Sequence, residues 1–392
     1  MAKKTTTRKK TTKKKPAKAT PAVQTAAADA GPAHPPPIAL AELVGQRRAA
    51  SVIEATIRSG RVHHCWLFSG PRGVGKFTAA LSFAALLLDP TTGPDLSGAL
   101  GADPDGEVAR LLRAATHPDL HIVNKELAAY SREASVRSGK QTTIPVDVLR
   151  EFLIEPATLG PRHPPGGLAS RVFIVDEAEL MGGGQRVGQN ALLKTLEEPP
   201  PGAVIILVTE SEERLLPTIR SRAQRVAFLP VAEGELRAWA AARYPEVAVD
   251  VLDRAVAFAD GSPGVLRELI EDDVLAWHDT IEPMLDEAAG GRFPAALGGQ
   301  LTKLADEWAK GWVKHDERRS KEMANRVAAT KLFRVIGLHA RRMLRSRDRV
   351  VVGVAAAHAV TRAEQRLAAN TQMSMVMEGI AADLAEAGRR QS

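Results

Sequence analysis

Three short runs of almost wholly apolar residues constrain the fold of this chain more than any other feature. They read CWLF at residues 65–68, VFIV at 172–175 and AVIILVT at 203–209. Segments with helical spacing of apolar residues follow the first two, at 79–88 and 189–198. We also predict helices at 38–60 and 146–154, and a loop at 89–105, which is rich in Pro, Gly and Asp. Strands that are buried on both faces read as continuous apolar runs. We therefore predict an α/β fold, a parallel sheet with helices on both faces, and further strands at 119–123 and 225–228.

A glycine-rich motif comes directly after the first predicted strand. Residues 70–77 read GPRGVGKF and fit the pattern G-x-x-x-x-G-K. In this pattern Gly70, Gly73 and Gly75 let backbone N–H groups turn toward phosphates, and Lys76 reaches the β and γ oxygens. The motif therefore predicts a nucleotide site. The alternative is a loop that survives only as a structural turn.

Phe77 departs from this motif at the position that normally carries Ser or Thr. That hydroxyl ligates Mg²⁺, and a phenyl ring has no oxygen to offer. Thr78 comes one residue later and is rotated by about 100° around the helix, so it is not a simple substitute. We therefore expect binding of ATP and Mg²⁺ to be weak or absent, and we assign no protein side chain as a metal ligand.

An acidic pair, Asp176-Glu177, ends the second predicted strand. An aspartate at such a position can hold Mg²⁺ through water, and the adjacent glutamate can polarise an attacking water. The alternative is an acidic pair that caps the next helix. The strand context favours the functional geometry, whereas the missing hydroxyl at Phe77 weakens the prediction that this geometry is used.

The charge of the chain is concentrated in its first 38 residues, which carry nine Lys or Arg and one acid, Asp29. The remainder is almost neutral. A segment rich in Lys, Thr, Ala and Pro does not build a core, so residues 1–38 are predicted to be a disordered basic tail. Such a tail attracts DNA in a salt-dependent way, or it only keeps the chain in solution.

Composition excludes several classes of protein. The single cysteine, Cys65, excludes a disulfide framework within the chain and a zinc site built on several cysteines. No run of 18 apolar residues is present, and the basic N-terminus lacks the apolar segment of a secretory signal. We expect a reducing cytoplasm as the compartment.

Helical patterns alone follow residue 232, with breaks at GSPG (261–264) and at 290–291. We predict four units: the tail at 1–38, the α/β domain at 39–229, a small helical domain at 230–274 and a larger helical domain at 275–392. Arginines at 341, 342 and 345 form a basic patch, which we interpret as a solvated face rather than a DNA contact.

Together these segments resemble the clamp-loader ATPases of the AAA+ class in bacterial DNA polymerase III. The resemblance covers roughly residues 40–270, and its most specific segment is NALLKTLEEPP at 190–200. The other matching segments are LVGQ (43–46), HCWLFSG (64–70), VDEAE (175–179), LLPTIRSR (215–222) and GSPG (261–264). The resemblance implies an AAA+ domain, a helical lid at 230–274 and a helical collar for oligomerisation at 275–392.

The resemblance also implies roles for single residues. Asp176 and Glu177 correspond to the Walker B pair, Thr209 to sensor 1 and Arg267 to sensor 2. Arg222 corresponds to an arginine finger, which a subunit donates to the ATP site of its neighbour, where a fixed positive charge stabilises the γ-phosphate. The alternatives are a strand-end threonine at 209 and a solvated surface arginine at 222.

Three departures from the family pattern shape the expected function. Ala223 replaces the cysteine of a Ser-Arg-Cys motif, residues 89–118 lack the four-cysteine zinc module of many relatives, and Phe77 removes the metal hydroxyl. Degenerate phosphate loops are typical of the non-motor subunit. The resemblance therefore implies a stator of the DNA-directed DNA polymerase holoenzyme, with little ATPase activity of its own and no zinc.

The partners implied are the gamma/tau and delta subunits of a hetero-oligomer, the sliding β clamp and primed DNA. Two alternatives stay open. One is an active ATPase of the gamma/tau type, and the other is a DNA-binding accessory protein that acts through its basic tail.

Overall fold

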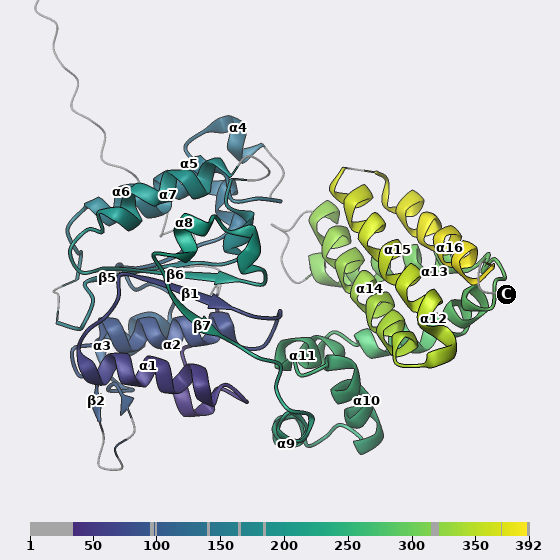
Figure 1. Cartoon of the computed structure of the whole chain (residues 1–392), viewed down its shortest axis with the longest axis horizontal. Helices are drawn as coiled ribbons and strands as arrows, with labels where there is room; N and C mark the ends of the chain where they lie inside the picture. Colours follow the sequence, from purple (N-terminus) through teal and green to yellow (C-terminus); the bar gives the residue numbers. More distant parts are fainter. Residues whose placement is uncertain are drawn as a thin grey trace, which may run out of the picture.

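The computed structural model describes residues 34–94, 98, 100–138, 142–163, 166–182, 186–314, 321–369 and 371–389. Most of the predicted tail, residues 1–33, lies outside these ranges. The described chain forms an α/β domain, a group of three helices beneath it and a bundle of long helices beside it (Figure 1).

The α/β domain is built on a five-stranded sheet in the order β4-β5-β6-β1-β7. The strands are β1 Cys65–Ser69, β4 Leu120–Val123, β5 Arg171–Val175, β6 Ala203–Thr209 and β7 Gln224–Ala227. All neighbouring pairs are parallel. Each of the five predicted strands is present within one or two residues of its expected bounds, and the predicted α/β fold class is confirmed.

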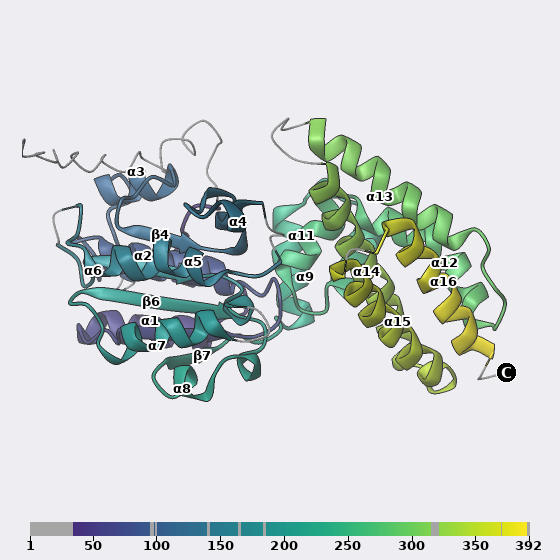
Figure 2. The same ribbon diagram turned by 90° about the horizontal axis from the view of Figure 1, so that it is seen from above.

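Helices cover both faces of this sheet, as Figures 1 and 2 show. Trp66 and Phe68 of β1 pack with α1 (Arg47–Ser59), α2 (Lys76–Leu88) and α3 (Glu107–Arg113). Cys65 and Leu67 pack on the opposite face. That face carries α5 (Val146–Leu149), α6 (Glu155–Thr158), α7 (Val187–Glu197) and α8 (Pro217–Arg220). Alternate residues thus enter two separate cores, which is why the strands are apolar throughout.

The structure differs from the predicted elements at several places. The helix expected from residue 38 begins only at Arg47, after a short 3₁₀ turn at Leu40–Glu42. Gly45 breaks it, because its φ is +67° and an added Cβ would lie 2.8 Å from Cγ1 of Val231. The expected loop at 89–105 contains a two-residue hairpin, β2 Gly93–Pro94 and β3 Leu100–Gly101.

Further differences concern helices. A π-helical turn, Arg150–Ile154, joins α5 to α6, so the helix predicted at 146–154 continues to Thr158. The short elements that were not predicted include α3, α4 (Ala134–Arg137), α8 and the 3₁₀ segment Lys125–Tyr130. They lie in stretches too short to show a clear apolar period.

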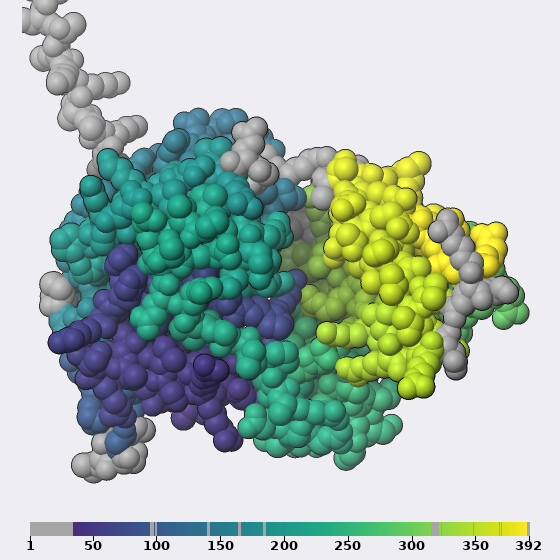
Figure 3. All heavy atoms as spheres, in the orientation of Figure 1, coloured from purple at the N-terminus to yellow at the C-terminus, as the bar shows by residue number. Residues whose placement is uncertain are grey.

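All of the described elements that follow β7 are helical. The first three are α9 Glu233–Arg243, α10 Val249–Ala259 and α11 Pro263–Glu271, and the rest are α12 Val274–Ala289, α13 Leu297–Lys314, α14 Lys321–Leu344, α15 Val350–Ala368 and α16 Met373–Arg389. One hydrophobic core runs through both groups, from Val231 to Leu384. Figure 3 shows the sheet domain and the long helices as two masses that α9 to α11 connect. No described helix is both long and apolar enough for a membrane span.

Candidate functional site

A cavity of about 590 Å³ opens at the carboxyl ends of β1, β5 and β6. The phosphate loop, the acidic pair after β5 and the start of α11 line it. Parallel α/β sheets bind ligands at this edge, and the volume is within the range of small-molecule sites. The cavity therefore brings together nine residues that the sequence singled out: Gly73, Gly75, Lys76, Phe77, Thr78, Asp176, Glu177, Thr209 and Arg267.

The phosphate loop has the turned backbone that its glycines predict. The φ angles of Gly70, Gly73 and Gly75 are +151°, +73° and +103°, in the region that side chains disfavour. Lys76 begins α2 and is 5% exposed, and its Nζ donates to the carbonyl oxygens of Gly70 at 2.7 Å and Pro71 at 2.6 Å. Burial lowers the pKa of Lys76. The ammonium group therefore binds its own loop, and a phosphate would have to replace these carbonyl contacts.

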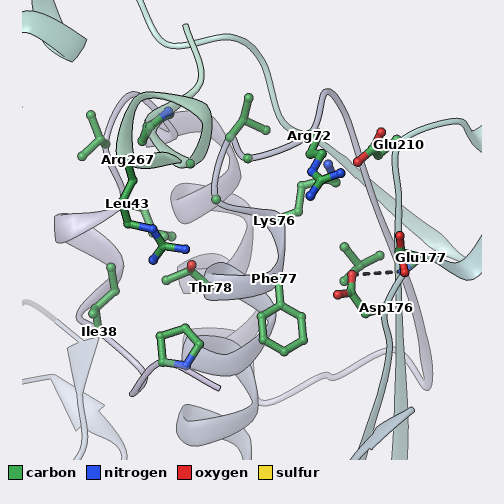
Figure 4. Close-up of a pocket in the computed structure, with 18 of the residues that line it drawn as sticks. Ile38, Leu43, Arg72, Lys76, Phe77, Thr78, Asp176, Glu177, Glu210 and Arg267 are labelled. Atoms are coloured by element: carbon green, nitrogen blue, oxygen red, sulfur yellow. Dashed lines mark hydrogen bonds between the residues drawn. The ribbon is translucent and has the colours of Figure 1, made fainter. Parts of the chain in front are cut away.

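Phe77 and Thr78 lie on different sides of the cavity (Figure 4). The Phe77 ring lies on the side of Asp176 and packs against the core beneath α2. The Thr78 hydroxyl lies on the side of Arg267. An apolar ring thus occupies the region between the phosphate loop and the acidic pair, where a metal-binding hydroxyl would be needed.

The acidic pair differs in the environment of its two carboxyl groups. Burial raises the pKa of Asp176 to about 6, and the charge of Glu177 adds to this rise. Glu177 has a φ of +51°, donates its backbone N–H to Asp176 Oδ1 at 3.0 Å and pairs with Lys125 Nζ at 2.6 Å. In this arrangement the Glu177 carboxylate is held by a lysine.

The two candidate sensor residues are both at the cavity. Thr209 is buried, and its hydroxyl donates to Glu179 Oε2 at 2.7 Å, while the Glu210 N–H donates to Glu179 Oε1 at 3.3 Å. Arg267 points into the cavity toward Thr78 (Figure 4), with a distant pair at 3.8 Å to Glu271. Glu179 was not among the predicted site residues, although its place in the VDEAE segment was a usable signal.

The first turn of α11 docks directly on the phosphate loop. The Gly264 N–H donates to the Gly73 carbonyl at 2.8 Å, and the Ser262 hydroxyl donates to the Arg72 carbonyl at 2.9 Å. The Arg72 guanidinium lies 3.7 Å from Glu268 of the same helix. The loop and α11 therefore form one unit, and a ligand that moves the loop also moves α11.

Glu268 is also the point where α14 reaches this unit. Lys331 and Arg334 of α14 both pair with it, Lys331 at 3.9 Å. Burial lowers the pKa of Arg334 to about 10. One carboxylate thus faces cations from the phosphate loop and from a helix of the long bundle, a contact between segments far apart in sequence.

Arg222 lies away from this cavity. It follows α8 and precedes β7 by two residues, and β7 runs parallel to β1, so Arg222 is at the edge of the sheet opposite the phosphate loop. Its guanidinium pairs with Glu197 Oε1 at 2.8 Å and donates to the Thr218 carbonyl at 3.1 Å. A four-residue strand spans about 13 Å, so the side chain cannot reach the cavity of its own chain.

The basic patch on α14 is largely paired. Arg341 and Arg345 both contact Asp260, and Arg342 contacts Glu282 at 3.1 Å. These pairs fit the interpretation as a solvated, charge-balanced face.

Comparisons with known proteins agree with the motifs in this domain. The model of a family described as "DNA polymerase III, delta subunit" matches residues 45–232. The delta' subunit of DNA polymerase III from Pseudomonas aeruginosa is 34% identical over 210 residues, or 53% of this chain and 55% of that one. The delta' subunit from Escherichia coli is 32% identical, over 56% and 58%.

A subunit of the motor type matches as well. The gamma/tau subunit of Mycobacterium tuberculosis is 35% identical over 52% of this chain and 30% of its own length. The chain spans little more than half the length of the delta' subunits it matches. The match coincides with the described α/β domain, its phosphate loop and its Walker B strand. Residues 45–232 are therefore similar to clamp-loader subunits of DNA polymerase III, of both the delta' and the gamma/tau type.

Proposed function

We propose that this chain acts as the delta' subunit of a DNA polymerase III clamp loader and donates Arg222 to the ATP site of a neighbouring subunit. The observation that carries the proposal is the position of Arg222 at the sheet edge opposite its own cavity. An arginine so placed has no role in the nucleotide site of its own chain, and it is 36% exposed at the surface. It is therefore available to a neighbour.

The cavity itself supports weak nucleotide binding without efficient hydrolysis. The turned phosphate loop, the N-terminus of α2 and Arg267 suit an anionic ligand. Phe77 occupies the place of the Mg²⁺ ligand, and Lys125 holds Glu177. We propose that ATP, if it binds, stabilises the loop and α11 rather than turning over.

The partners we propose are those of a clamp loader: gamma/tau and delta subunits in a hetero-oligomer that places the sliding β clamp on primed DNA. The relatives named above are themselves delta' and gamma/tau subunits, which supports a hetero-oligomer that contains gamma/tau. The long helices α12 to α16 are the proposed collar that joins this chain to the others.

The experiment compares Arg222→Ala with Arg225→Ala in a clamp loader rebuilt from the host's gamma/tau and delta subunits. Arg225 is the matched control, since it lies three residues away and pairs with Glu212 at 3.3 Å. With clamp and primed DNA present, loss of an arginine finger slows hydrolysis at the affected site by about 10³-fold or more. Arg225→Ala should leave the rate unchanged. Equal rates for wild type and Arg222→Ala would exclude the finger.

The similarity to gamma/tau subunits keeps an active ATPase as the second candidate. ATP hydrolysis by the isolated chain distinguishes the two candidates, because a stator does not hydrolyse ATP on its own and a motor subunit does. The tail alternative is tested by removing residues 1–33 rather than 1–38, since the Ile38 N–H donates to Ser82 at 3.1 Å and Ile38 lines the cavity. A stator still assembles without this segment, whereas an accessory protein that acts through its tail loses its function.

A further inference from the structure

A polar cluster interrupts the apolar contact between α12 and α14. It consists of His278 and Glu282, one turn apart on α12, and His339 on α14. The two histidines are 1% and 6% exposed. Phe258 of α10 closes one side, with its ring 4.6 Å from that of His278. The cluster lies in the helical half of the chain, on elements that do not line the phosphate-loop cavity.

The three side chains converge on one point. One donor atom from each lies within 4.8 Å of the other two. His278 Nε2 and His339 Nδ1 are 3.4 Å apart, and Glu282 Oε2 is 3.7 Å from His278 Nδ1. Two ligands of a tetrahedral Zn²⁺ ion, at bond lengths of about 2.0–2.1 Å, are separated by about 3.3 Å. His278 Nε2 and His339 Nδ1 already have this spacing. The half-exposed Glu282 carboxylate faces the other ring nitrogen of His278, so it must rotate toward Nε2 to complete the ligand set.

The internal hydrogen bonding of the cluster is incomplete. His278 Nδ1 and His339 Nε2 are buried, and neither has a hydrogen-bond partner among the described residues. These are the ring nitrogens on the outer side of the facing pair. When the inner nitrogens hold an ion, the outer ones are left to donate to a carboxylate or to water, as in most histidine–metal sites. Burial lowers the pKa of both imidazoles, that of His339 to about 4, and the neutral imidazole is the form that binds metal ions.

The charges around the cluster leave a carboxylate oxygen for a cation. Arg342 binds Glu282 through Oε1, at 3.1 Å, and so leaves Oε2 on the side of His278. Asp279 adds a second carboxylate 3.8 Å from His278 Nδ1. Two imidazoles with a carboxylate are a ligand set for Zn²⁺ and similar divalent transition metals rather than for Ca²⁺ or Mg²⁺.

We propose that His278, Glu282 and His339 form a site for one divalent transition-metal ion, with Zn²⁺ as the best match. The ion joins α12 to α14 and thereby fixes the first helix of the long bundle against its central helix. Its role is structural, since it lies in a packed seam and not in a substrate cavity. It is independent of the cysteine-based zinc module, which the sequence lacks.

The test titrates the full chain, freed of metal with a chelator, with Zn²⁺ against a chromogenic indicator. Wild type is compared with His339→Gln and Glu282→Gln, and His358→Gln serves as the matched control because His358 is an exposed histidine on α15. We expect each cluster variant to lose one equivalent of Zn²⁺, or about tenfold or more in affinity, and the control to keep it. Zn²⁺ should also raise the Tm of wild type and not that of Glu282→Gln.

Equal Zn²⁺ stoichiometry and affinity in all four proteins would contradict the proposed metal site. The cluster would then be a buried histidine pair without a metal. Glu282 is half-exposed, and Glu282→Gln keeps the volume of the side chain and a contact to Arg342. This variant therefore tests the metal site even if His339→Gln fails to fold. Circular dichroism in the presence of chelator checks that the variants are folded. Binding of Co²⁺, read from its visible absorption, separates a nitrogen-rich site from adventitious carboxylates.

Discussion

At the scale of single residues, the cavity combines a well-formed phosphate loop with groups unsuited to metal-dependent hydrolysis. Lys76 binds the carbonyl oxygens of its own loop, Phe77 replaces a hydroxyl, and Lys125 holds Glu177. Asp176 keeps a raised pKa, because burial outweighs the hydrogen bond from the Glu177 N–H and the nearby charge of Lys76. Each of these features can be tested by one substitution.

Phe77→Thr restores the missing metal ligand. We expect nucleotide affinity in the presence of Mg²⁺ to rise by about tenfold, equivalent to about 1.4 kcal/mol. The measurement is a titration with a fluorescent ATP analogue, with and without Mg²⁺. Phe77→Val is the matched control, because the valine side chain has the shape of threonine but carries no hydroxyl. A similar gain in both variants would mean that the phenyl ring only blocks the cavity.

Asp176→Asn removes the cost of burying a charge. The folded pKa of about 6 lies above the ordinary value of 3.8, so wild type is destabilised as the pH rises from about 4 through 6. Above pH 6 the variant should be more stable than wild type by up to roughly 3 kcal/mol, and below pH 4 the two should agree. Thermal unfolding across this pH range checks the prediction. A constant difference at all pH values would contradict it.

At the scale of elements, the docking of α11 on the phosphate loop is the contact with the clearest consequences. Ser262 caps this helix by accepting from the Val265 N–H at 3.2 Å, and its hydroxyl donates to Arg72 of the loop. Gly73 has no room for a side chain, because an added Cβ would lie 2.4 Å from Ser262 Oγ. The conformation of the phosphate loop and the position of α11 are therefore coupled through direct contacts.

Ser262→Ala removes both the cap and the contact to the loop. We expect a loss of about 1–2 kcal/mol in the unfolding free energy, as for other N-cap serines. Urea unfolding measures this loss, and Ser135→Ala on the exposed α4 serves as the control. If the two variants were equally stable, the contact between α11 and the loop would contribute nothing measurable.

At the scale of the whole molecule, Glu268 connects the phosphate loop with α11 and the long bundle. Arg72 reaches it from the loop, and Lys331 and Arg334 reach it from α14. Lys331 also pairs at 2.6 Å with Asp272, the residue that follows α11. The cations of α14 therefore have two acidic partners, Glu268 within α11 and Asp272 at its end. A change at the loop can therefore be transmitted to the helices proposed as the collar.

Glu268→Gln removes the negative charge at this junction. Lys331 keeps its pair with Asp272, but Arg334, which is only 17% exposed, would lose its carboxylate partner, and we expect a loss of about 3 kcal/mol in the unfolding free energy. Glu235→Gln is the control, since its partner Arg47 is 89% exposed and such pairs contribute within about 1 kcal/mol. Urea midpoints report both. Equal midpoints would show that Glu268 is not a junction.

The sequence alone determined the parts of this protein that depend on local pattern. Continuous apolar runs specify strands buried on both faces, and the structure has all five predicted strands in one parallel sheet. The glycines of residues 70–75 specify a turned loop, because they alone adopt its positive φ angles freely. These features are encoded within a few neighbouring residues, so a single sequence suffices to read them.

Only the tertiary structure decided which distant residues meet. The pairing of Glu179 with Thr209, the convergence of cations on Glu268, and the cluster of His278 and His339 join segments that are 30 to 196 residues apart. Arg222 stands at the far edge of the sheet because β7 runs parallel to β1. Such contacts depend on how helices and strands pack against one another. The spacing of apolar residues within one segment does not show which other segment it packs against.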